Sequence, residues 1–509
     1  MGKLTDKVAR GVFWVLLEKF GVQLAHFVVT LVLARLLTPN DYGTVALLSV
    51  FIAIANVFVD CGFGKALVQK KNASQTDYNT VFYLSMSIAG VLYVGMFFAA
   101  PLVADFYGIS DLKIMLRVLA LSLIFHSING VQNVELNRKM LFHLSFRISW
   151  VKTIVSAVTG ISFALAGYGP WALVWASIFG GIAGVIARQL VIRWRPSLTF
   201  SWDSAKGLFR FGWKLLVVAL IDRLYSNIQA LLIGKFYTRA DLAFVNKGRH
   251  IPYLISNLVS DTLRRVSFPA LARMQDDPVR LRNAMRRMVR VSTFLVFPVM
   301  TMLAVLAAPI VEVLFGPRWL PSVPYLRLIC FSAMLLQIDT INRQAIMAMG
   351  RSDIALWISA LRRVACLGIM ACTLHLGVFI FFASVAIAVV PLGFFMNAFP
   401  NHFLLRYTVP MQLADMFVPF AFSAVSGSVL LATNFLPFVQ KWMFPLQALV
   451  FVAVYSLLSF LFLPRSVREM SAAVLPTARR KLHEGGLIVR VLTHVAGKYG
   501  EASQTERKC

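Results

Sequence analysis

The sequence predicts an all-α polytopic membrane protein with about 14 transmembrane helices. Hydrophobic residues make up 59% of the 509 residues, charged residues only 14%, and the mean hydropathy is +0.73. A soluble chain of this length needs far more charge on its surface. Apolar runs of about 18 to 25 residues alternate with short polar breaks, and a helix needs that length to cross a bilayer. A polar turn motif also recurs at a fixed spacing, which indicates an internal repeat.

The first half of the chain contains six predicted spans. The first of them follows a basic N-terminal segment. Because no small-residue cleavage site ends this run, we expect a retained span rather than a signal peptide. The six predicted helices cover residues 12–36, 42–60, 80–103, 114–132, 148–167 and 170–191.

The second half repeats this count and adds two helices. The predicted spans cover residues 209–235, 249–270, 289–315, 322–348, 354–376 and 378–400, followed by 412–434 and 443–463. We therefore expect two pseudo-symmetric six-helix lobes around a central cavity plus two C-terminal helices. The predicted parts are an N-lobe (1–200), a C-lobe (201–405), two additional helices (406–463) and a basic cytoplasmic tail (464–509).

A polar turn between the first two spans is the clearest sign of a repeat. Pro39 fixes φ for a turn, and the side chains of Asn40 and Asp41 can bond their own backbone. The same motif returns 200 residues later, where Lys235, Thr238 and Asp241 match Arg35, Thr38 and Asp41. A second pair of loops agrees, since Gly108 and Arg117 recur as Gly316 and Arg327. The repeat predicts two halves of like orientation, related by an axis along the membrane normal.

The basic residues predict the orientation. Lys and Arg are retained in cytoplasmic loops, and an N-in topology places roughly 35 of them inside against roughly 10 outside. The formal charge of +28 is therefore assigned to the inner face rather than to nucleic-acid binding. An even number of spans agrees with both termini lying in the cytoplasm.

Polar residues inside the predicted spans mark the candidate site. An ionisable residue in hydrocarbon costs several kcal/mol unless it faces protein or water, so such residues usually point inward. They form stripes at helical spacing, most clearly on the first and seventh helices, which hold equivalent places in the two halves. The candidate substrate-binding residues are Lys19, Gln23, His26, Asp222, Arg223, Ser226, Asn227, Asn257, Asp261 and Arg343.

Within this set Lys19 and Arg223 are the candidates for holding an anionic substrate, because both are positively charged. The guanidinium of Arg223 is also suited to grip a phosphate through two bonds. His26 is a candidate proton-linked switch, although a lone histidine on a polar stripe is more often a hydrogen-bonding residue. The structural alternative for the carboxylates is an internal ion pair of Asp222 or Asp261 with a nearby arginine.

Enzyme signatures are absent from the sequence. It contains no P-loop, HExxH, GxSxG or CxxC motif, and its five cysteines show neither metal-ligand spacing nor a disulfide framework. We therefore expect a protein that is not an enzyme, with no cofactor and no metal. A coupling ion, H⁺ or Na⁺, is left open.

Six stretches spread over both halves carry a family resemblance: LARLLTPNDYG (33–43), FVDCGFGKALVQKK (58–71), LRVLALSL (116–123), GYGPWALV (167–174), FPALARMQDD (268–277) and LFGPRW (314–319). With these stretches the chain resembles the polysaccharide-transporter branch of the multidrug/oligosaccharidyl-lipid/polysaccharide exporter superfamily, the O-antigen and exopolysaccharide flippases. The resemblance implies two six-helix lobes around a cavity, and cationic cavity residues that hold a pyrophosphate.

The resemblance also implies a function. It is the translocation of undecaprenyl-pyrophosphate-linked oligosaccharide across the bacterial inner membrane by alternating access, for lipopolysaccharide or exopolysaccharide biosynthesis. The implied partners are this lipid-linked substrate, membrane lipid and the polysaccharide polymerase and chain-length machinery. A monomeric transport unit is expected because both halves lie on one chain.

Two alternatives remain open from the residues. A cation-coupled exporter of drugs or metabolites needs a compact carboxylate site, for which Asp222, Asp261 and Asp339 are available. A membrane polymerase or ligase typically carries a large outer loop, and the short predicted outer loops disfavour it.

Overall fold

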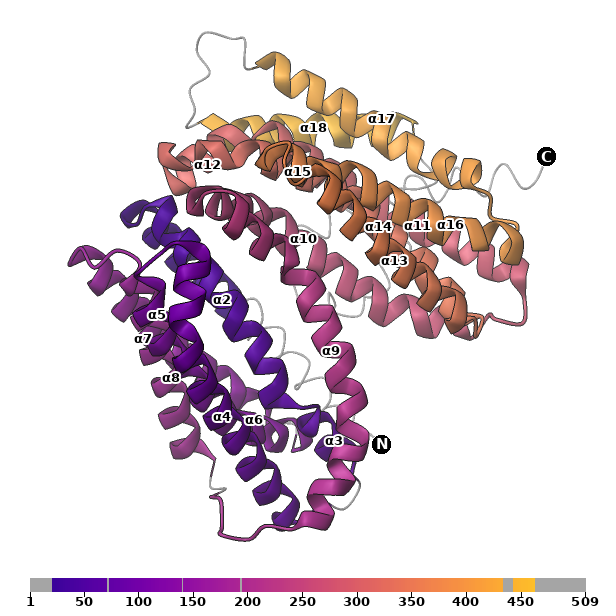
Figure 1. The fold of residues 1–509 in the computed structure, drawn as a ribbon. Helices are drawn as coiled ribbons and strands as arrows, with labels where there is room; N and C mark the ends of the chain where they lie inside the picture. The colour runs from indigo at the N-terminus through magenta and orange to yellow at the C-terminus, as the bar shows by residue number, and fades with distance from the viewer. Residues whose placement is uncertain (1–20, 71–72, 140, 193–194, 434–442, 463–509) are drawn as a thin grey trace, which may run out of the picture. The chain divides into compact units, whose positions relative to one another are not determined.

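The computed structural model describes residues 21–70, 73–139, 141–192, 195–433 and 443–462, and within these ranges the chain is helical without any strand. Figure 1 shows the long helices and their short connections. The predicted all-α polytopic class is confirmed. Lys19 and the basic tail (464–509) lie outside the described residues.

Apart from one short added helix, the helices up to residue 236 follow the order predicted from the apolar runs. An apolar helix over Gly21–Leu36 comes first. It is followed by α2 (Pro39–Asp60), α3 (Phe63–Gln69), α4 (Gln75–Tyr107), α5 (Leu112–Ala120), α6 (Ser122–Arg138), α7 (Phe142–Leu165), α8 (Trp171–Val191) and α9 (Trp202–Phe236).

The remaining helices include two departures from regular α-helix. A 3₁₀ helix, η1 (Pro317–Ser322), precedes α13, and a π-helical turn, η2 (Val385–Val389), lies between α15 and α16. The α-helices are α10 (Arg239–Ala272), α11 (Pro278–Val305), α12 (Ala307–Phe315), α13 (Val323–Ala348), α14 (Ser352–Thr373), α15 (Val378–Ser384), α16 (Val390–Leu405), α17 (Val409–Thr433) and α18 (Phe444–Phe462).

Each of the 14 predicted spans lies largely on helix where the structure describes it. Among the described residues, 12 helices are long and apolar enough to cross a membrane. The two predicted spans outside that set are Gly21–Leu36, which is apolar but shorter, and α10, whose sequence is rich in charged residues. The count of 14 therefore stays a prediction.

One helix, α3, was not predicted. The sequence indicates only a basic loop after the second span, but Phe63–Gln69 is helical. Cys61 and Gly62 take left-handed backbone conformations with φ of 43° and 71°, which ends α2 and redirects the chain. Burial of Phe63 and Leu67, 2% and 0% exposed, then stabilises the short helix.

The turn motif has the same geometry in both repeats. Thr38 and Asp41 form a capping box at the start of α2, with the Thr38 hydroxyl donating to the Asp41 carboxylate at 2.7 Å. At the start of α10 the Thr238 hydroxyl donates to Asp241 at 2.6 Å, and the Asp241 amide donates back to Thr238 at 3.1 Å. A capping box satisfies amide groups that the first turn of a helix leaves unpaired. The sequence repeat is thus matched by a repeat of local structure.

The described chain divides into two compact units. Unit 1 contains the residues up to Asn257, Leu306–Leu335 and Asp353–Gly393, and unit 2 contains Leu258–Val305, Leu336–Ser352 and the residues from Phe394 on. These units do not follow the predicted lobe boundaries, which stay a prediction.

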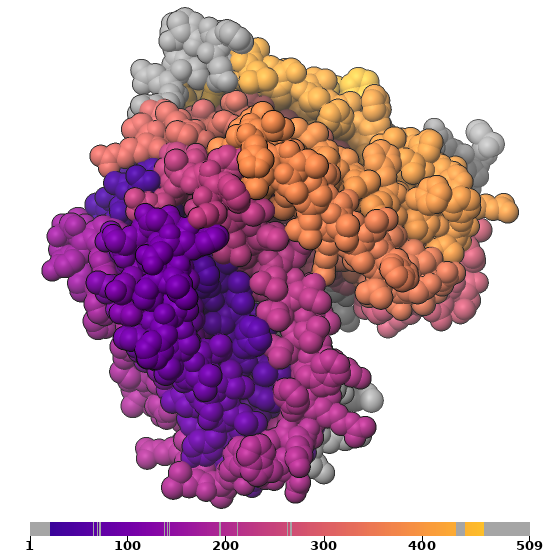
Figure 2. Space-filling model, viewed as in Figure 1, coloured from indigo at the N-terminus to yellow at the C-terminus, as the bar shows by residue number. Residues whose placement is uncertain are grey.

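Unit 1 has a continuous apolar core built from both repeats. Leu47 and Leu116 from the first repeat belong to one buried cluster with Tyr325 and Phe381 from the second. In the space-filling view the indigo helices and the magenta α9 lie against each other (Figure 2). This contact requires small residues, because a Cβ at Gly212 of α9 would lie 2.6 Å from the Cys61 carbonyl oxygen.

Unit 2 is held by aromatic and charged contacts between α11, α17 and α18. Phe297 packs edge-on against Phe420 with ring centroids 6.3 Å apart, and the Tyr455 hydroxyl donates to the Phe294 carbonyl at 3.0 Å. Arg286 donates to Asp415 through Nε and Nη2 at 2.8 and 3.0 Å.

Candidate functional site

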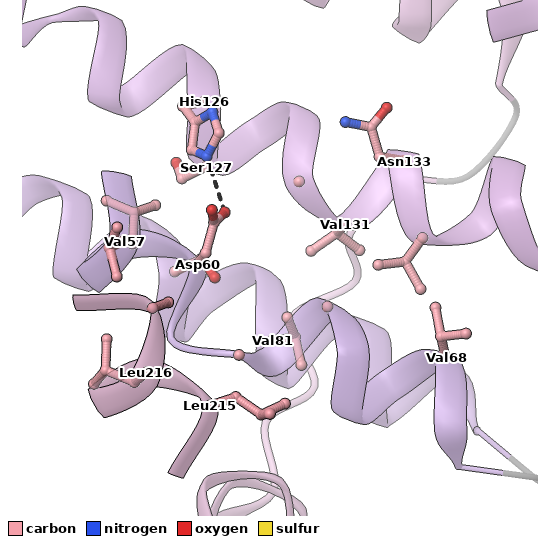
Figure 3. A pocket seen from close by; sticks show the side chains of 17 residues that line it. Val57, Asp60, Val68, Val81, His126, Ser127, Val131, Asn133, Leu215 and Leu216 are labelled. Atoms are coloured by element: carbon pink, nitrogen blue, oxygen red, sulfur yellow. Dashed lines mark hydrogen bonds and ion pairs between the residues drawn. The ribbon is translucent and has the colours of Figure 1, made fainter. Parts of the chain in front are cut away.

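A pocket of about 500 Å³ lies in unit 1, where α2, α3, α4, α6 and α9 come together. Its wall is mostly aliphatic, with Val57, Val81, Val131, Leu215 and Leu216 among the lining residues (Figure 3). Aliphatic walls of this kind suit a hydrocarbon chain or another apolar group.

The polar part of the pocket wall is contributed mainly by α6. His126, Ser127 and Asn133 line the pocket from this helix, and Asp60 from the end of α2. The His126 Nε2 and the Asp60 carboxylate lie 2.9 Å apart (Figure 3). Burial and the neighbouring Asp60 carboxylate raise the pKa of the Cys61 thiol, so this cysteine next to the pocket stays protonated.

Two cationic side chains adjoin the polar end of the pocket. Arg188 of α8 donates from Nη2 to the Asn133 Oδ1 at 3.1 Å, which ties it to the pocket wall. A Cβ built on Gly184 would lie 3.6 Å from Arg188 Nη1 and 3.7 Å from the Lys152 Cδ, so both side chains pass over this glycine. Two like charges held this close favour an anion between or beside them.

His26 extends this polar strip to the first helix. Its Nε2 lies 3.5 Å from the hydroxyl of Thr153, the residue after Lys152 on α7. The structure therefore brings His26, Lys152, Arg188 and Asn133 together along one side of unit 1. His26 is the member of the predicted set that lies in this strip.

Four predicted residues on α9 follow one another along a single helix. Asp222 forms an ion pair with Arg363 of α14. An internal ion pair with a nearby arginine is the structural alternative to substrate binding for this carboxylate. Ser226 and Asn227 both donate to the Arg223 carbonyl, at 3.0 and 2.8 Å, so these polar groups bond their own helix. The Arg223 side chain is exposed.

The remaining predicted residues are separated from this strip. Gln23 and Asn257 are exposed in unit 1, whereas Asp261 is exposed and Arg343 half-buried in unit 2. The role of these residues stays a prediction, as does that of Lys19.

Sequence reasoning did not single out Lys152 and Arg188. Lys152 lies inside the predicted span 148–167 and could have been found as an ionisable residue at membrane depth. Arg188 lies near the end of the predicted span 170–191, where its charge counts only toward the orientation. The small residues Gly180 and Gly184, one turn apart on the same face, were the signal that α8 approaches another helix closely there.

Unit 2 contains a second polar cluster, which is internally paired. The Asp415 side chain is 3% exposed and accepts hydrogen bonds from Arg286, Arg290 and Tyr407. Burial and the Asp415 carboxylate raise the pKa of Tyr407, so its hydroxyl remains a donor. The Asn397 amide donates to Asp339 at 2.6 Å. Across the residues that the structure describes, no group of three or more His, Cys, Asp or Glu side chains could hold a metal ion.

Comparison with known proteins gives a family match over more than half of the chain. The family model of the polysaccharide biosynthesis proteins matches residues 32–324. The teichuronic acid biosynthesis protein TuaB of Bacillus subtilis is 23% identical over 84% of this chain and 89% of its own length. The succinoglycan biosynthesis transport protein ExoT of Rhizobium meliloti is 25% identical over 72% and 74%, and the lipopolysaccharide biosynthesis protein WzxC of Escherichia coli is 25% identical over 69% and 73%.

Solved structures show the same fold at lower identity. The lipid II flippase MurJ, in an inward closed conformation, superposes with a TM-score of 0.71 over 89% of this chain and 98% of its own, at 13% identity. A multidrug resistance MATE family transporter in an inward-facing conformation superposes with a TM-score of 0.57 over 81% and 96%, also at 13% identity.

Proposed function

Since this chain belongs to the polysaccharide biosynthesis protein family, within the polysaccharide flippase branch of the multidrug/oligosaccharidyl-lipid/polysaccharide exporter superfamily, we propose that it is a flippase. Its substrate is undecaprenyl-pyrophosphate-linked oligosaccharide, which it moves across the bacterial inner membrane by alternating access. Relatives named as transport or biosynthesis proteins for succinoglycan and lipopolysaccharide support a role in making such polymers. The chain is a transport protein rather than an enzyme.

The observation that carries this proposal is the cationic pair beside the aliphatic pocket. The substrate joins a pyrophosphate to a long hydrocarbon chain, so its binding site needs cations next to an apolar surface. Arg188 and Lys152 supply the positive charge, with Arg188 held against the pocket by Asn133. The valine and leucine wall supplies an apolar surface within reach of the same ligand.

A cation-coupled exporter is supported less well by these contacts. Such a transporter needs a carboxylate that is available to the coupling ion. Asp222 is instead paired with Arg363, which already neutralises its charge.

The first test is polymer production in a strain that lacks the gene, together with the leaflet location of lipid-linked intermediates. The proposal predicts loss of polymer and accumulation of undecaprenyl-linked oligosaccharide facing the cytoplasm. If repeat units reach the outer leaflet and stay unpolymerised, the protein acts after flipping.

Complementation with variants then tests the cationic pair. Arg188→Gln and Lys152→Gln should each lower the rate of polymer production about tenfold, because each removes a charge-assisted contact to the phosphates. Lys19→Gln and Arg223→Gln test the two cations predicted from sequence. Lys206→Gln is the matched control, since Lys206 is an exposed cation near the start of α9. Wild-type rates in both the Arg188 and Lys152 variants, at equal protein levels, would remove this pair from the substrate path.

A further inference from the structure

Lys247 of α10 is a buried cation surrounded by aromatic rings. The residue is 6% exposed, and its Nζ lies 4.1 Å from the ring centroid of Tyr42 and 5.0 Å from those of Phe315 and Trp319. Within the described chain no carboxylate lies within ion-pair distance of it. The ring faces compensate only part of the hydration that the ammonium loses.

The repeat shows that this position does not require a cation for packing. Leu47 is the residue 200 positions earlier, at the equivalent place in α2, and it is buried at 1% exposure. Burial of a leucine at such a place stabilises the fold, whereas burial of an unpaired ammonium destabilises it. The buried charge at Lys247 therefore makes the packing around it less stable than a leucine at this position would.

The rings around Lys247 belong to helices that meet where α2 and α10 begin. Trp319 is fully buried and donates from Nε1 to the Ala34 carbonyl at 2.8 Å, which joins η1 to the end of the first helix. A Cβ on Gly43 would lie 1.8 Å from the Arg239 carbonyl oxygen, so the first turns of α2 and α10 are in direct backbone contact. We call this group of contacts in unit 1 the seam.

The seam is also bonded reciprocally by the two repeats. Arg35, at the end of the first helix, donates to the Leu314 carbonyl at 3.3 Å and to the Val313 carbonyl in the last turn of α12. Its repeat equivalent Lys235 donates to the Phe106 carbonyl in the last turn of α4. Each cation thus binds the negative end of a helix from the other repeat. This arrangement joins the first helix and α4 of one repeat to α9 and α12 of the other.

We propose that Lys247 is the positioning residue that keeps the seam reversible, so that helix ends from the two repeats can part during transport. With the seam closed, the ammonium is desolvated among Tyr42, Phe315 and Trp319. When the seam opens, water rehydrates the ammonium. The hydration free energy regained offsets the cost of the apolar surface that opening exposes. The proposal rests on the proposed function, because a flippase must open one end of its helix bundle to release its substrate.

The test is the reactivity of a cysteine hidden by the closed seam. Thr44 is 2% exposed and its hydroxyl accepts from Arg239 at 3.4 Å, so Thr44→Cys in a cysteine-free full-length chain is shielded until the seam opens. The protein is reconstituted in lipid nanodiscs, where both faces are accessible, and its initial rate of labelling by a charged maleimide is measured.

Two variants are expected to move this rate in opposite directions. Lys247→Leu should slow the labelling of Thr44→Cys about tenfold, because it removes the charge that favours opening. Tyr42→Leu should speed labelling by a similar factor, because it removes the ring closest to the ammonium and leaves the charge. Lys247→Arg keeps the charge and should retain fast labelling.

Arg117→Leu is the matched control. The Arg117 guanidinium also lies over a ring, 4.0 Å from the Phe97 centroid, but this contact joins α5 to α4 within one repeat. It should leave the rate unchanged. A rate in the Lys247→Leu variant at or above that of the parent, in protein that elutes as one monodisperse peak, would overturn the proposal. Labelling does not depend on which substrate is carried, so this result is separate from a failure of the polymer assay.

Discussion

Two buried charges of the described chain, Asp415 and Lys247, are accommodated in opposite ways. Asp415 in unit 2 has its charge matched by two arginines and a tyrosine hydroxyl, with all donor distances between 2.7 and 3.0 Å. Lys247 in unit 1 has only ring faces. A fully paired buried ion is expensive to disturb, whereas an unpaired one is inexpensive to expose. These two residues therefore predict a fixed contact in unit 2 and a changeable one in unit 1.

Removing the Asp415 carboxylate should destabilise the protein strongly. Asp415→Ala leaves Arg286 and Arg290 side by side without their acceptor, and we expect a loss of about 3 kcal/mol. The measurement is the apparent melting temperature of the purified protein, which should fall by several degrees. Asp222→Asn breaks an ion pair whose partners are 54% and 36% exposed, and it should cost less than about 1 kcal/mol. Equal melting temperatures for the two variants would contradict this ranking.

Close packing of α7 on α8 places the cationic pair. A Cβ on Gly180 would lie 2.9 Å from the Ser156 Cβ and 3.4 Å from the Lys152 carbonyl oxygen, so the two helices touch along their backbones. Small residues permit this approach between membrane helices. The position of Lys152 relative to Arg188 therefore depends on residues that carry no charge.

Enlarging Gly180 should separate these helices. Gly180→Leu is expected to cost about 1–3 kcal/mol and to lower polymer production in complementation, because it displaces the backbone that carries Lys152. Gly95→Ala in α4 is the control, since nothing lies within 4 Å of a Cβ there. This substitution should be neutral or slightly stabilising. Full activity of Gly180→Leu would show that the spacing of α7 and α8 does not matter for transport.

The sequence predicted the features that depend on a local pattern and missed those that depend on contacts between distant residues. The apolar runs located the helices because a span must be long and apolar wherever it packs. Thr38 and Asp41 predicted a turn whose capping box involves residues only three apart. The Arg188–Asn133 hydrogen bond joins residues 55 positions apart. The contacts of Lys247 with the rings of Tyr42 and Trp319 join α10 to α2 and η1. No local pattern encodes such pairings, so the polar stripes were found while their partners were not.

The membrane topology of the chain depends on how many of its helices cross the membrane. α10 is 34 residues long, about 51 Å at the rise of an α-helix, whereas a bilayer core is about 30 Å thick. Length therefore allows it to span, but its charged residues exclude it from the 12 spans that are apolar enough by composition. A helix of this composition can cross only if much of it faces protein or water. The burial of Lys247 within unit 1 satisfies that requirement for one of its charges.

Cysteine labelling in intact cells tests this topology. Ser110 lies in the connection between α4 and α5, and Gln275 lies between α10 and α11; both residues are exposed. If α10 spans, they lie on opposite sides, so a membrane-impermeant maleimide should label Ser110→Cys in intact cells but Gln275→Cys only after permeabilisation. If α10 lies along the membrane surface instead, Gln275→Cys is labelled in intact cells as well. That result would also reverse the orientation of every helix after α10 and move the C-terminus outside, against the even count and the distribution of basic residues. One cysteine after α10 therefore tests whether α10 counts among the 14 spans and, with it, the cytoplasmic placement of the C-terminus.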